Sequence, residues 1–138
     1  MKTHTLRGRL DARTNKRLIV DDGRFTSSMV VKEFYVWAKS VSSSEDPECF
    51  LSKQPLTENA FDASDGRQIA WASQTTSATS RVMNFSVVDP EHVIIQDLYI
   101  RNIADTEQAN YLIVLEEQNL TEDQAVLQLI KEVSQDVN

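Results

Sequence analysis

The chain has 138 residues, of which 41% are hydrophobic and 25% charged, with a formal net charge of −7. This length predicts one domain with a sizeable core, and this composition argues against wholesale disorder. A single cysteine, Cys49, excludes an intrachain disulfide and a cysteine zinc cluster. No apolar run approaches the ~20 residues of a membrane helix, and we expect no secretory signal peptide because the N-terminus lacks an apolar core.

The first 17 residues are strongly basic, whereas the rest of the chain is acidic. Against a single acid, Asp11, they carry six basic residues: Lys2, Arg7, Arg9, Arg13, Lys16 and Arg17. This segregation predicts a basic arm that docks on an acidic surface, such as a neighbouring copy of the same protein. Two alternatives are nucleic acid, which an acidic body would repel, and a solvated, poorly ordered terminus. The six basic residues are the predicted partner-binding set.

Several strands are predicted between residues 29 and 88. Residues 29–41 alternate as one long strand that is expected to bulge midway, with Lys32 and Glu33 near an edge or a strand end. Three shorter strands follow, and turn signals at Asp22-Gly23 and Asp65-Gly66 precede two of the predicted strands. The shorter strands are CFLSK (49–53), RQIAWASQT (67–75), in which Ile69 and Trp71 should face the core, and RVMNFSVV (81–88).

The strongest strand signals are two apolar runs, 93–101 and 111–117, with a short polar segment between them. Their closeness in the chain predicts that they pair with each other. The second run is apolar on both faces, which is typical of a central strand. Alternation of side chains places five residues in the core: Ile94, Leu98, Ile100, Ile113 and Leu115.

A helix is predicted at 121–133, where Thr121 and Gln124 fit a capping box. An apolar stripe at helical spacing would pack on the sheet or on a partner: Val126, Leu129, Ile130, Val133 and Val137. The predicted fold is mainly β, an antiparallel β-sandwich or jelly roll with one C-terminal α-helix. The expected division is an arm at 1–17, the sandwich at 18–119 and the helix at 120–138.

No catalytic or cofactor motif is evident. His4 and His92 lack a second ligand at a metal-binding spacing, and a calcium-loop echo at 62–66 lacks its closing acid. We therefore expect no enzymatic activity, no cofactor and no bound metal. Two tryptophans and two tyrosines could line a sugar-binding surface, but their placement in patterned strands favours core packing. These four aromatic residues are Trp37, Trp71, Tyr35 and Tyr99.

Four runs resemble a type of small virion protein found in marine tailed bacteriophages: LIVDDGRFTSSMVVKEFYVW, RQIAWAS, VVDPEHVIIQDLYI and NYLIVLEEQNLTEDQAVLQLIKE. The likeness covers most of residues 18–133, without the basic arm and 44–62. It implies a structural component of the virion, made in the host cytoplasm and repeated in many copies.

The expected function is therefore that of a capsid decoration or cement protein that joins neighbouring capsid subunits. The alternatives are a tail or fibre-base component, and a carbohydrate- or receptor-binding β-sandwich module. Expected partners are the major capsid protein or tail subunits, with homo-oligomerisation and with neither nucleic acid nor membrane.

Overall fold

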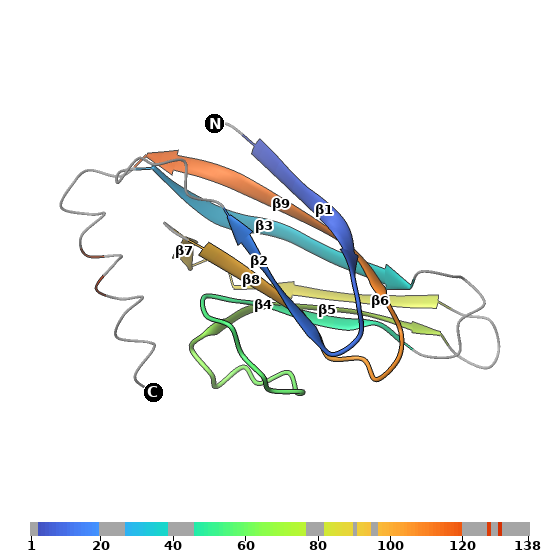
Figure 1. Cartoon of the computed structure of the whole chain (residues 1–138). Coiled ribbons are helices and arrows are strands. Elements are labelled where there is room, and N and C mark those ends of the chain that lie inside the picture. Colours follow the sequence, from blue (N-terminus) through green and yellow to red (C-terminus); the bar gives the residue numbers. More distant parts are fainter. Residues whose placement is uncertain are drawn as a thin grey trace.

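The chain folds into two antiparallel β-sheets that lie face to face (Figure 1). The computed structural model describes residues 3–19, 27–38, 46–76, 82–89, 91–94 and 97–119, with the single residues 127 and 130. Sheet A has the order β1-β9-β3-β7, and sheet B the order β2-β8-β4-β5-β6. The strands are β1 Thr3–Leu10, β2 Thr14–Ile19, β3 Ser27–Ala38, β4 Glu48–Ser52, β5 Gln68–Thr76, β6 Val82–Val88, β7 Val93–Ile94, β8 Asp97–Asn102 and β9 Ala109–Asn119. This mainly β, two-sheet architecture confirms the β part of the predicted fold class, whereas the described residues do not support the predicted C-terminal helix.

The main core lies between the two sheets and contains the residues that alternation placed there. Ile94, Leu98, Ile100, Ile113 and Leu115 are each at most 1% exposed, so this prediction is confirmed. The period-2 pattern identified these positions because each strand buries only one of its faces in the main core.

The two apolar runs that supply much of this core do not pair with each other. β8 pairs with β2 and β4 in sheet B, whereas β9 pairs with β1 and β3 in sheet A. The predicted pairing is therefore wrong, because residues 103–108 carry the chain from one sheet to the other. Asn102 anchors this crossing, since its side-chain amide donates to the carbonyls of Leu10 and Glu107. β9 is nevertheless a central strand, as its sequence indicates.

β3 is long and bulged, as predicted. Its register against β9 shifts between Val31 and Glu33, which gives Lys32 an unpaired position. Past the bulge, Phe34 and Val36 are buried, while the alternate residues face outward. One edge of β3 pairs with β9, and along its other edge the described pairs are Met29 and Val30 with β7. The remainder of that second edge faces β5 and β6 of the opposite sheet.

The basic N-terminal segment is built into both sheets. β1 pairs along its whole length with β9, a turn at 11–13 follows, and β2 pairs with β8. Arg13 adopts a positive φ of 56° in this turn, a conformation uncommon for a residue with a side chain. The predicted boundary at residue 17 falls inside β2. The segment is thus part of the sandwich and not a separate arm, because its own alternation buries Leu10 and Leu18.

Gly8 makes room for Tyr111 where β1 and β9 meet. The two residues are register partners, and a Cβ added at Gly8 would lie 2.7 Å from Tyr111 Oη and 3.0 Å from Cζ. Tyr111 is 1% exposed, so its ring has little freedom to move away. A glycine is therefore required here by the close approach of a buried ring.

Replacing Gly8→Ala should destabilise the fold by about 1–3 kcal/mol, the usual effect of overpacking a core. Denaturant unfolding measures the change, with Thr5→Ala on the exposed side of β1 as the control. Adding Tyr111→Phe, which removes Oη, should give a double variant whose loss is smaller than the sum of the two single losses. Strict additivity would contradict the steric explanation.

A second, smaller core lies on the outer face of sheet B. It contains Phe50, Leu56 and Ile103, with Phe61 and Trp71 packed against them. Trp71 was expected in the main core beside Ile69, but it lies on the opposite face because of a register shift where β4 meets β5. Its indole Nε1 donates to Gln68 Oε1 at 2.8 Å.

Arg101 holds the 53–67 connection against this face of sheet B. Although only 8% exposed, it makes three hydrogen bonds: Nε to Glu58 O at 2.9 Å, Nη1 to Asn15 Oδ1 at 2.9 Å and Nη2 to Asn59 Oδ1 at 2.8 Å. Burial lowers the pKa of its guanidinium, because a charged group loses its hydration there. The three acceptors compensate for that lost hydration. One side chain thus joins the N-terminal strand of sheet B to the connection.

The predicted C-terminal helix lies outside the described residues, apart from two positions within it. Leu127 and Ile130 are described, and both side chains are exposed. The capping pair Thr121 and Gln124 and the rest of the stripe lie outside the described part, as does the Asp22-Gly23 turn.

Candidate functional site

The six basic residues predicted to bind a partner fall into two groups. Arg13 forms an ion pair with Asp105, and Arg17 Nη2 lies 2.9 Å from Asp97 Oδ2, which raises the pKa of Arg17. Lys16 places its Nζ 5.9 Å from the centroid of the Tyr111 ring. These three side chains are engaged within the fold, and Lys2 lies outside the described residues.

Arg7 and Arg9 form the other group, on the outer face of sheet A. Both side chains are exposed, and no carboxylate pairs with either among the residues that the structure describes. Arg9 Nε donates to the neutral Asn110 Oδ1 at 3.1 Å. The structure thus leaves these two guanidiniums free to meet an acidic surface.

The register of sheet A places apolar and aromatic side chains beside these arginines. Across β1, β9 and β3, one row contains Arg9, Asn110 and Trp37, and the next contains Arg7, Leu112 and Tyr35. Leu112 is half-buried, and no described strand covers this face. We call the β1 and β9 part of it, Arg7, Arg9, Leu112 and Val114, the basic face.

The aromatic residues do not all pack in the core as expected. Tyr35 and Trp37 are 41% and 40% exposed, so that expectation is wrong for both. The bulge at Lys32 sets their direction, since the extra residue reverses which side chains of β3 point outward. Tyr35 Oη donates to Glu33 Oε1 at 2.9 Å, which raises the pKa of the tyrosine. Trp71, by contrast, packs in the second core, and Tyr99 is half-buried.

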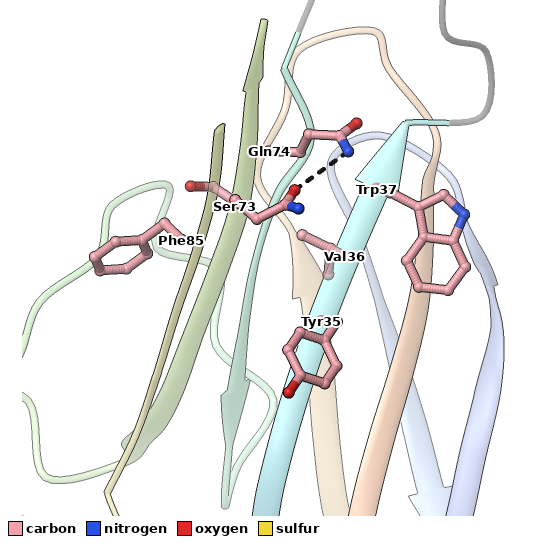
Figure 2. A pocket seen from close by; sticks show the side chains of 7 residues that line it. Tyr35, Val36, Trp37, Ser73, Gln74 and Phe85 are labelled. Atoms are coloured by element: carbon pink, nitrogen blue, oxygen red, sulfur yellow. Dashed lines mark hydrogen bonds between the residues drawn. The ribbon is translucent and has the colours of Figure 1, made fainter. Parts of the chain in front are cut away.

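An open groove of about 290 Å³ lies between the free edge of β3 and the ends of β5 and β6. Figure 2 shows Gln74 and Ser73 on the β5 side and Val36 on β3, while the rings of Trp37 and Phe85 point outward, away from the space between these strands. Phe85 is 48% exposed. All described residues that line the groove are uncharged: Tyr35, Val36, Trp37, Ser73, Gln74, Asn84 and Phe85. Sequence reasoning missed this groove because it joins strands distant in the chain.

Two side chains of sheet B bridge to the free backbone edge of β3 beside this groove. The Ala38 N–H donates to Gln74 Oε1 at 3.0 Å, and Ser86 Oγ donates to the Phe34 carbonyl at 2.6 Å. Gln74 Nε2 in turn donates to Asn84 Oδ1 at 3.3 Å. These bonds hold the amides in one orientation, because a backbone N–H requires an oxygen opposite it.

The two histidines and the cysteine take structural positions. His4 Nε2 lies 3.2 Å from Glu117 Oε2, and His92 Nε2 lies 3.0 Å from Asp89 Oδ2. Burial is the main cause of a lowered pKa at His92. Cys49 is fully buried, and burial raises the pKa of its thiol, so the reactive thiolate is disfavoured.

Within the described ranges, no three histidine, cysteine or acidic side chains gather as a metal site would require. The calcium-loop echo is a local turn, in which Asp62 Oδ1 accepts from the backbone N–H of Ser64 at 3.0 Å. The described residues also contain no helix with the length and apolarity to cross a membrane. A scan against protein-family models finds no match, and a search of curated proteins finds no relative.

Proposed function

We propose that this chain is a non-enzymatic structural protein of a tailed-phage virion, a capsid decoration protein that joins neighbouring capsid subunits through its basic face. The observation that carries the proposal is the pair Arg7 and Arg9, exposed on an edge strand without carboxylate partners among the described residues. The choice of a virion as the assembly that contains this protein comes from the resemblance of the sequence to small virion proteins. The proposed partner is the major capsid protein, with further copies of this chain alongside.

The basic face combines three features that favour a protein surface as its partner. A single exposed ion pair contributes only about 0.2–1 kcal/mol, so two arginines do not suffice for stable attachment. Leu112 and Val114 of β9 add apolar area beside the arginines of β1. β1 is also an edge strand, whose unpaired backbone groups could bond a partner strand. Neither membrane nor nucleic acid is part of the proposal.

A tail or fibre-base component is the second candidate, and the same face would serve it. In that case the basic face would contact the next copy in a closed ring, since head-to-tail interfaces close when the rotation allows. The number of copies in a purified virion separates the two, because a decorated capsid holds many more copies than one tail ring.

Replacing both arginines, Arg7→Gln with Arg9→Gln, should reduce incorporation into particles by about tenfold or more, equivalent to ~1.4 kcal/mol or more of attachment free energy. The measurement is the amount of this protein per particle after purification. The matched control is Arg13→Gln with Arg17→Gln, which removes the same charge from residues that pair within the fold. Equal losses in the two double variants would contradict attachment through the basic face.

A further inference from the structure

We propose that the groove between β3, β5 and β6 binds a neutral saccharide, one or two sugar rings of a larger glycan. Its volume of about 290 Å³ lies near the lower end of the range of small-molecule sites, roughly 300–1,000 Å³. The groove is lined by the amides of Gln74 and Asn84 and the backbone edge of β3, with the apolar side chain of Val36 beside them. That combination suits a sugar, which presents hydroxyl groups around its edge and C–H groups on its faces.

The amide pair at the floor is prepared to donate hydrogen bonds. Gln74 Oε1 is occupied by the Ala38 N–H, and Asn84 Oδ1 by Gln74 Nε2. Because both oxygens are engaged, the amides offer mainly N–H groups: both hydrogens of Asn84 Nδ2 and the second hydrogen of Gln74 Nε2. Sugar hydroxyl oxygens would accept these without any rearrangement of the side chains.

The free edge of β3 supplies a complementary pair of backbone groups. The Phe34 carbonyl and the Ala38 N–H both bond toward sheet B. Alternate residues of an antiparallel strand direct their backbone groups to the same side, so the N–H and C=O of Val36 also face the groove. A ligand there meets one further donor and one acceptor, and a hydroxyl group serves both at once.

The lining also argues against other classes of ligand. No described lining residue is a cation that would hold a phosphate, and none is a carboxylate that would hold an amine. A lipid would leave the amides of Gln74 and Asn84 without partners. A peptide strand added to β3 would collide with the side chains of Ser86 and Gln74, which already bond that edge. A neutral, hydroxyl-rich ligand remains.

The groove and the basic face lie at different edges of the molecule. Arg7 and Arg9 stand on β1 at one edge of sheet A, whereas the groove lies beyond β3, on the other side of β9. A protein attached to a particle by β1 would therefore keep the groove accessible. Saccharide binding at the groove does not depend on attachment of the protein to a particle, so the isolated protein suffices for the test.

The test is an NMR titration of the ¹⁵N-labelled full chain with four neutral probes: maltotriose, cellotriose, chitotriose and galactobiose. At least one should shift, saturably, the Gln74 and Asn84 side-chain amides and the backbone N–H of Val36. Asn84→Asp keeps Oδ1 as the acceptor for Gln74 but replaces the two Nδ2 donors, so binding should weaken about tenfold, the effect of losing one or two hydrogen bonds.

The matched control is Gln118→Glu, which makes the same change of charge near the far end of β9 and should bind as the wild type does. Three results would overturn the proposal: no saturable shift at the groove with any of the four probes, equal affinity of the Asn84→Asp variant, or saturable shifts that centre on other residues. Chemical-shift changes at the groove that depend on protein concentration alone would assign the groove to a second copy of this chain. That result would also overturn the saccharide proposal.

Discussion

Deletion of residues 1–17 is expected to abolish cooperative folding. The deletion removes β1, which pairs along its whole length with β9, and most of β2, which pairs with β8. It therefore uncovers an edge of a central strand in each sheet and the core residues behind them. Loss of the buried Leu10 side chain alone should cost about 2–5 kcal/mol, against a total stability of about 5–15 kcal/mol for an ordinary domain.

Circular dichroism and denaturant unfolding of the truncated protein measure this effect. We expect a weakened strand signal and no cooperative transition. The full-length Arg7→Gln, Arg9→Gln variant is the control, since it removes charge from the same segment but keeps both strands. A truncated protein that unfolds cooperatively at the wild-type midpoint would show that the segment is an appendage after all.

Arg101→Ala is expected to lower the free energy of unfolding by about 3 kcal/mol. The substitution leaves three acceptors on the 53–67 connection and β2 without their donor, two of them Asn15 Oδ1 and Asn59 Oδ1. Hydrogen bonds to a charged group contribute about 1.5–3 kcal/mol each, and removal of one partner of a buried polar network usually costs several kcal/mol in all. Leu56 and Phe61 of the connection should also detach from Phe50 and Ile103, which exposes apolar surface.

Denaturant unfolding measures the loss, and hydrogen exchange along 53–67 locates it. Arg17→Ala is the matched control, because the exposed guanidinium of Arg17 pairs with Asp97 in water and exposed ion pairs contribute little to stability. Similar losses in the two variants would contradict the role of Arg101 as the anchor of the connection.

The local features of this fold follow directly from its sequence. Alternation predicts the buried face of β8 and β9, and the long pattern of β3 predicts a bulge midway but not its position at Lys32. Both features depend on neighbouring side chains along one strand, so the alternation of apolar and polar residues within that strand indicates them. Alternation does not indicate which strands pair with each other. The sequence predicts that β8 and β9 pair, yet the six residues between them carry the chain from one sheet to the other.

The candidate sites were harder to predict, for the same physical reason. The charge pattern predicts one basic arm, but the turn at Arg13 divides these residues between two sheets, where some form ion pairs and others remain exposed. Tyr35 and Trp37 point outward because the bulge reverses the alternation of β3 beyond Lys32, and the sequence pattern does not fix where that reversal occurs. The groove joins β3 to β5 and β6, whose proximity no local pattern encodes.

The most direct test of the proposed attachment is to add the protein back to particles stripped of it, at increasing salt concentration. Exposed charges are screened over about 10 Å at 0.1 M salt, so wild-type occupancy should fall steadily as salt rises. The Arg7→Gln, Arg9→Gln variant should bind weakly at low salt and depend much less on salt. If both proteins bind equally and their occupancies follow the same salt dependence, the basic face does not hold this protein to the particle.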